Sequence, residues 1–123
     1  MQPFEPGQTW AYATRASEER SRIVVCLVEP HADLGEIVHI HINELNFKNK
    51  HAATGVSSKI EHMPYSANAL RESGITLDGS VGQIPDITEG YQQWKTEFDK
   101  GDAGVWSIPV SEAVEYMEQT LNQ

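Results

Sequence analysis

Residues 21–46 read SRIVVCLVEPHADLGEIVHIHINELN, and this stretch decides the fold. Its first part, residues 22–28, is almost continuously apolar and β-branched, which is typical of a strand covered on both faces. Its second part, residues 37–43, alternates, so that aliphatic side chains point one way and His39 and His41 point the other. Between them, Pro30, Asp33 and Gly35 favour a turn. The stretch therefore predicts a β-hairpin with a loop of about six residues.

Two further segments have the pattern of strands. Residues 8–14, QTWAYAT, alternate between bulky and small side chains and place Trp10 and Tyr12 on one face. The simplest topology for this segment and the hairpin is an antiparallel meander of three strands. Residues 59–65, KIEHMPY, predict a short fourth strand, and Pro64 either places this strand at an edge of the sheet or marks its end.

Helical signals are confined to the second half of the chain. Ser66 is placed to cap a short helix over residues 67–73, and Ser111 to cap a final helix over residues 112–121. Residues 75–85 carry glycines and a proline without helical periodicity, so we expect a loop there. The clearest helix follows this loop and ends before Gly101, and a buried stripe is expected at Ile87, Tyr91, Trp94 and Phe98.

These elements predict the α+β class: an antiparallel sheet of three or four strands with two or three helices packed on one face. That face is the one that carries Val38, Ile40 and Ile42. No repeat or linker divides the 123 residues, so residues 1–123 are expected to form a single domain.

Charge is the most informative property of the composition. The chain has 9 basic and 18 acidic residues, a net charge of −9, and residues 71–123 alone carry 3 basic and 10 acidic residues, a net of −7. Such a protein repels nucleic acid and anionic membranes and attracts a basic partner protein. Glu115 and Glu118 lie in an acidic row on the final predicted helix and are candidate contacts for such a partner. The alternative is that these residues are simply solvated surface.

Cellular location is constrained by Cys26 and by the N-terminal sequence. Cys26 is the only cysteine, so an intramolecular disulfide is excluded, and its apolar neighbours predict a small buried side chain. The opening MQPFEPGQTW lacks the basic and apolar regions of a secretory signal, and no apolar run is long enough to span a membrane. We therefore expect a cytoplasmic protein without membrane contact.

A metal site is suggested only by His39 and His41, whose spacing would let both rings ligate one ion. The H-x-H-x2-E spacing that ends at Glu44 is similar to part of the cupin motif. It departs from that motif because cupins place three or four residues before the glutamate and supply a later histidine. We therefore predict no metal and no cofactor, and we expect the two histidines on a partly solvated face of the sheet.

No catalytic residue is assigned from sequence motifs. The chain has no G-x-S-x-G nucleophile elbow and no P-loop lysine in its glycine-bearing segment at residues 78–82. One binding surface is predicted: if the meander is correct, Trp10 and Tyr12 share a sheet face with His39 and His41. Aromatic side chains of this kind are typical interface anchors. In the alternative, the loop at residues 48–58 covers this face.

A resemblance supports the same picture. The opening FEPGQTWAYATR, followed by GEIVHIHI, HMPYSANAL and EGYQQWK, resembles a group of small uncharacterised bacterial proteins. The resemblance implies a stand-alone bacterial cytosolic protein and brings no activity with it.

The leading functional hypothesis is a non-enzymatic binding protein that contacts a basic partner, for example an immunity protein or an inhibitor, with a homo-oligomer also compatible. The alternative is a metal-dependent or small-molecule enzyme centred on His39 and His41. A third hypothesis is an accessory subunit of a larger assembly.

Overall fold

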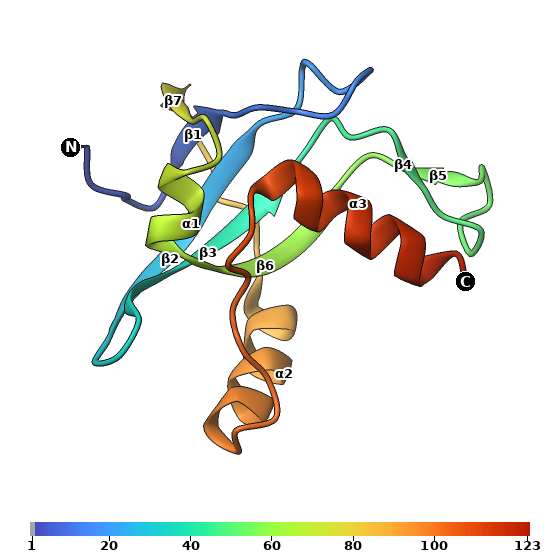
Figure 1. Ribbon diagram of the computed structural model, residues 1–123. Helices are drawn as coiled ribbons and strands as arrows, with labels where there is room; N and C mark the ends of the chain where they lie inside the picture. The colour runs from blue at the N-terminus through green and yellow to red at the C-terminus, as the bar shows by residue number, and fades with distance from the viewer. Residues whose placement is uncertain (1) are drawn as a thin grey trace.

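Five antiparallel strands form the central sheet of the computed structural model, which describes residues 2–123 (Figure 1). The sheet has the order β6-β3-β2-β1-β7, and its strands are β1 (Gln8–Ala11), β2 (Ile23–His31), β3 (Gly35–Ile42), β6 (Ile60–Ser66) and β7 (Thr76–Ser80). A small hairpin pairs β4 (Phe47–Lys48) with β5 (Val56–Ser57). The helices are α1 (Ala67–Arg71), α2 (Thr88–Asp99) and α3 (Val110–Leu121). The predicted α+β class is confirmed.

The number of strands in the main sheet exceeds the predicted three or four. The meander of β1, β2 and β3 and the edge position of β6 are as predicted. The additional strand, β7, lies in the segment expected to be a loop and pairs with β1, with Leu77 opposite Trp10. All five residues of β7 are exposed and Gly79 interrupts them, so the strand has no alternation of buried and exposed side chains that could reveal it.

The β2–β3 hairpin is longer and tighter than predicted. Pro30 pairs with Glu36 and His31 with Gly35, which leaves a loop of residues 32–34. Gly35 has a φ of +79°, a conformation that glycine adopts without steric cost. The ladder contains a β-bulge at Cys26, because Val25 lies opposite Ile40 whereas Leu27 lies opposite His39.

The main core lies on the sheet face covered by α1 and α3. Trp10, Ile23 and Ile42 lie directly opposite one another across β1, β2 and β3, so their side chains point to this same face. α3 contributes three buried residues to the core, Val110, Ala113 and Val114. The resulting apolar cluster includes side chains from both ends of the chain.

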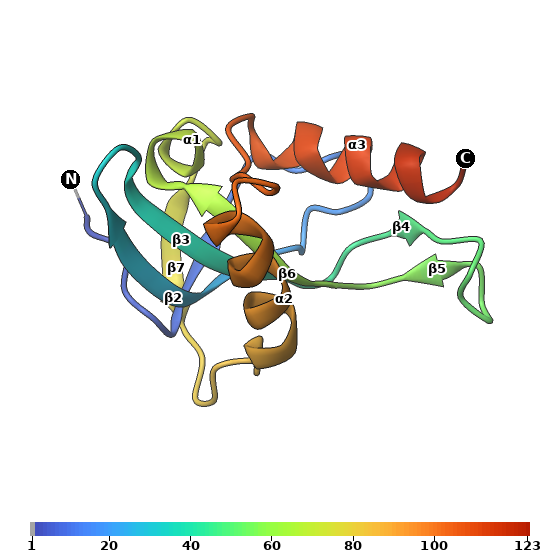
Figure 2. The ribbon, with the colours of Figure 1, turned by 90° about the horizontal axis from the view of Figure 1, so that it is seen from below.

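The helices cover both faces of the sheet, which corrects the prediction that they share one. α2 lies below the sheet in Figure 1, whereas α1 and α3 lie along another side; Figure 2 shows α1 and α3 above the sheet and α2 across β3 and β6. The predicted stripe on α2 meets the sheet, but no residue of α2 is fully buried. Helical periodicity identifies the apolar side of a helix without identifying the sheet face that it meets, and this is why the stripe was expected in the core.

The edge of the main sheet that β6 forms is covered by the segment before α3. The outer edge of β6 bonds to the segment before α3, through Ser66 N–H to the Trp106 carbonyl (3.0 Å) and Trp106 N–H to the Pro64 carbonyl (2.9 Å). Trp106 therefore covers this edge and forms a single β-bridge with Tyr65. Across residues 2–123, no helix combines the length and apolar character needed to cross a bilayer.

Candidate functional site

A chain of hydrogen-bonded polar side chains lies between the sheet and α2. His39 is completely buried and is held on both sides: its Nε2 lies 2.7 Å from Glu29 Oε1, and its Nδ1 lies 2.9 Å from His62 Nε2. The Tyr91 hydroxyl of α2 donates to the other oxygen of Glu29 at 3.1 Å. Four side chains from β2, β3, β6 and α2 are thus connected in one chain.

Two β-bulges bring these residues together. The bulge at Cys26 leaves Leu27 opposite His39, so Glu29, two residues further along β2, points to the same face as His39. In β6, Ile60 lies opposite Ile42 and Met63 opposite Ile40, so two residues, Glu61 and His62, oppose His41 alone. Bulges of this kind re-aim side chains, and here His62 is directed toward His39.

Burial fixes the protonation of the two histidines. It lowers the pKa of His39, and it lowers the pKa of His62 to about 4, so both rings are neutral near pH 7. The Glu29 carboxylate accepts a hydrogen bond from His39 Nε2–H, which leaves His39 Nδ1 to accept one from His62 Nε2–H. The remaining nitrogen, His62 Nδ1, therefore carries a free lone pair.

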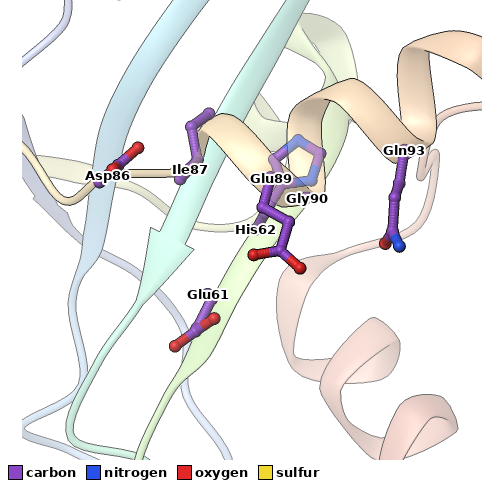
Figure 3. A pocket seen from close by; sticks show the side chains of 7 residues that line it. All are labelled: Glu61, His62, Asp86, Ile87, Glu89, Gly90 and Gln93. Atoms are coloured by element: carbon purple, nitrogen blue, oxygen red, sulfur yellow. The ribbon is translucent and has the colours of Figure 1, made fainter.

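That nitrogen lies beside a cavity of about 320 Å³ at the start of α2, which we call the His62 cavity (Figure 3). Its lining residues are Glu61, His62, Asp86, Ile87, Glu89, Gly90 and Gln93. Within residues 2–123, no group hydrogen-bonds to His62 Nδ1. A neutral nitrogen acceptor surrounded by carboxylates suits a cation that donates hydrogen bonds.

Gly90 keeps this nitrogen accessible. A Cβ atom at position 90 would lie 3.3 Å from His62 Cβ and 3.4 Å from His62 Nδ1, which is tighter than ordinary contact. Glycine in a helix costs about 1 kcal/mol relative to alanine. The close approach of His62 gives a physical reason for glycine at this position.

Aromatic rings form the wall behind His39. The ring centres of Tyr91 and Trp94 lie 4.9 Å and 5.0 Å from that of His39, both edge to face. Trp94 stacks on Phe98 at 4.5 Å, and its indole N–H donates to the Gly104 carbonyl at 2.8 Å. These rings exclude water from His39 and fix the orientation of its imidazole.

His41 does not join the chain. It is half-buried on the same face as His39, and its Nδ1–H donates to the Glu61 carbonyl at 3.2 Å. His39 is paired with His62 instead, and the expectation that it lies on a partly solvated face is wrong, because α2 covers it. Within residues 2–123, no group of three His, Cys, Asp or Glu side chains is arranged to hold a metal ion.

Trp10 and Tyr12 lie in the core rather than beside the histidines. They are 5% and 8% exposed and belong to the apolar cluster on the α3 face. The Trp10 indole donates to Gln8 Oε1 at 3.0 Å, and the Tyr12 hydroxyl lies 2.8 Å from Ser21 Oγ. The expectation that they form an exposed surface with His39 and His41 is wrong, because strand alternation alone does not identify the covered face.

Glu115 and Glu118 bind a residue of the same chain. Both carboxylates contact Arg15 Nη1, at 2.7 Å and 3.0 Å. Arg15 also forms two hydrogen bonds to the Glu18 carboxylate, each of 2.7 Å. Glu115 is half-exposed and Glu118 is mostly buried, so this acidic row holds the end of β1 against α3.

Sequence reasoning missed Glu29 and Tyr91 as parts of the site and did not pair His62 with His39. Nothing in the sequence locates the bulge in β6 that turns His62 toward His39. No protein-family description, curated protein or solved structure matches the chain, so the case for a function rests on the geometry of the site.

Proposed function

We propose that the protein is a non-enzymatic, cytoplasmic binding protein that contacts a basic partner, and that the His62 cavity receives a lysine or arginine side chain of that partner. The observation that carries this proposal is the free lone pair of His62 Nδ1 beside a cavity with three carboxylates in its wall. An immunity protein that neutralises a basic toxin is one concrete form of this function.

The carboxylates of the cavity differ in their availability. Glu61 is shared with Lys59, whose Nζ lies 3.4 Å away. Among residues 2–123, neither Asp86 nor Glu89 has a cationic partner within ion-pair distance. Hydrogen bonds from the Thr88 side chain and from its backbone N–H lower the pKa of the Asp86 carboxyl group, which stays ionised at neutral pH. A lysine ammonium would find two unpaired carboxylates and one nitrogen acceptor.

The net charge of the whole chain supports the same partner. A charge of −9 attracts basic proteins at long range and accelerates their encounter, and it disfavours nucleic acid. The cavity would then select a cationic side chain at short range.

A titration with hexalysine and hexaarginine peptides, followed by amide and imidazole NMR signals, tests the proposal. We expect shifts at His62, Glu89 and Gly90, and we expect Glu89→Gln to weaken binding about tenfold, equivalent to roughly 1.4 kcal/mol. Gly90→Ala should weaken binding similarly, because the added methyl group crowds His62 Nδ1, while the helix itself gains stability.

Glu97→Gln is the matched control, because it removes the same charge from an exposed position of α2 outside the cavity. Equal weakening by Glu97→Gln and Glu89→Gln would mean that the peptides sense only the overall charge. In that case the cavity would have no role.

A second candidate function is a small-molecule enzyme in which His62 acts as a general base, and the chain from Glu29 through His39 to His62 favours it. A pKa of about 4 makes His62 a weak base at neutral pH, whereas efficient general bases titrate near the working pH. Binding is therefore the better supported function. The enzyme would become the better supported function if the protein hydrolysed an activated ester, and if this activity were lost in His62→Gln and retained in His41→Gln.

A further inference from the structure

An apolar groove lies between α3 and the β4–β5 hairpin, on the side of the molecule that carries the main core. It encloses about 500 Å³, and its apolar lining consists of Phe47, Ile60, Trp106, Tyr116, Met117 and Leu121. The groove is separate from the His62 cavity, which lies at the start of α2 on the other face of the sheet.

Tyr116 stands at the rim of this groove and is its most exposed ring. It is 59% exposed, more than any other large hydrophobic side chain in residues 2–123. Its ring meets that of Trp106 edge to face, with 6.0 Å between centres. A protruding ring beside an apolar depression forms a self-complementary patch, which is what a two-fold contact between identical chains requires.

Two side chains of opposite charge lie on the two sides of the groove. Lys59 lines its strand side, whereas Glu112 lies outside the lining, on α3 one helical turn before Tyr116. Residues 45–60 contain three lysines and no acidic residue, in a chain whose net charge is −9. Lys59 is half-exposed and its contact with Glu61 is an exposed one, so it remains open to a second partner.

We propose that this groove is the interface of a homodimer, in which Tyr116 of each copy enters the groove of the other and Lys59 of each copy faces Glu112 of the other. A second copy supplies an aromatic ring for the apolar groove and the acidic side chain of Glu112 for the basic side chain of Lys59. Both complements lie on a single patch, so one two-fold axis satisfies them together.

Sedimentation equilibrium of the purified protein tests this proposal. We expect a mass twice the 13.7 kDa of one chain, falling toward 13.7 kDa on dilution. Tyr116→Ser should raise the dissociation constant about thirtyfold, as the loss of an interface hot spot does. Leu77→Ser is the control: Leu77 is also an exposed large hydrophobic side chain, but it lies on β7 at the far edge of the sheet.

Charge exchange provides a second, independent measurement. Lys59→Glu and Glu112→Lys should each weaken the dimer, and the two changes combined in one chain should restore it, because the pair is re-formed across the two-fold axis. Circular dichroism of each variant separates weakened association from failure to fold.

Three results would overturn the proposal. The first is a wild-type protein that remains at 13.7 kDa at millimolar concentration. The second is a dimer that Tyr116→Ser leaves intact. The third is a dimer that Leu77→Ser abolishes, because this would place the interface at the open edge of β7. None of these results bears on the His62 cavity, which is tested separately.

Discussion

Glu18 illustrates how much a single residue contributes to this small protein. It is 2% exposed, its two oxygens accept hydrogen bonds from Arg15, and one of them also accepts from Asn46 N–H at 2.7 Å. A buried carboxylate is stable only with such partners. It therefore fixes the turn between β1 and β2 to the chain that follows β3.

Glu18→Gln should lower the free energy of unfolding by about 3 kcal/mol, because it leaves Arg15 partly uncompensated while it keeps the shape of the side chain. Glu115→Gln removes a half-exposed partner of the same arginine and should cost less than about 1 kcal/mol. Urea denaturation of the two variants provides the measurement. Equal costs would show that burial does not strengthen the inner pair.

The buried histidines predict how stability depends on pH. The pKa of His62 is lowered in the folded state to about 4, so the unfolded chain binds more protons between that pH and its ordinary value near 6.5. This contribution to stability is fully present above pH 6.5 and is lost as the pH falls toward 4.

The urea midpoint of the wild type should therefore fall as the pH is lowered from 7 to 5, and the midpoint of His62→Gln should fall less steeply over the same range. Carboxylate titration is common to both proteins, so the comparison isolates the histidine. Parallel curves for the two proteins would contradict the burial argument.

At the scale of elements, α2 is the helix held least firmly. It contributes no fully buried residue, in contrast to α3, which contributes three. Its side-chain contact with the sheet is made by half-buried rings that pack against His31, His39 and His62, together with one hydrogen bond from Tyr91 to Glu29. Elements with few buried contacts open locally before the molecule unfolds.

Hydrogen exchange should show faster exchange in α2 than in β2 and β3. Trp94→Ala should cost about 2 kcal/mol, below the 3–5 kcal/mol of a fully buried tryptophan, and should accelerate exchange in α2 without affecting β3. Loss of protection throughout the sheet would mean instead that α2 belongs to the global folding unit.

The same elements show what could be predicted from the sequence and why. The alternation of residues 37–43 and the capping serine of α1 are local signals, and the strand and the cap that they predict are both present. The predicted start of α3 is two residues late, because the helix begins at Val110 directly after Pro109, so that Ser111 lies inside the helix and does not cap it. The choice of sheet face for α2 depends on contacts between distant residues, which local periodicity does not contain.

On the scale of the whole molecule, Arg15 connects the two ends of the chain. It contacts Glu115 and Glu118, which follow it by 100 and 103 residues. The candidate site also depends on distant pairs, since Glu29, His39 and His62 come from three strands. The residues of this site were each visible in the sequence, but their association depends on two bulges that have no local signature.

Reversal of the charge at Glu118 should therefore affect folding more than any contact with a partner. Glu118→Lys places a cation against Arg15 and removes the acceptor for Lys48 N–H, so we expect a loss of about 2–3 kcal/mol. Glu112→Lys, on an exposed side of the same helix, should cost less than about 0.5 kcal/mol. Thermal denaturation distinguishes the two variants. Similar melting temperatures would show that Glu118 is a solvated surface residue that does not stabilise the fold.

The bulge at Cys26 makes β2 tolerant of a length change that strands rarely accept. Deletion of one residue from a strand normally moves every later side chain to the opposite face. Removal of Cys26 would leave Val25 opposite Ile40 and Leu27 opposite His39 as they are now, with the extra residue gone and a regular ladder in its place. We expect the shortened chain to fold with Glu29 still bonded to His39, whereas deletion of Ile40 from β3, which has no extra residue in this ladder, should disrupt folding. The chain length is thus under weaker constraint at the bulge of β2 than in the regular strand beside it.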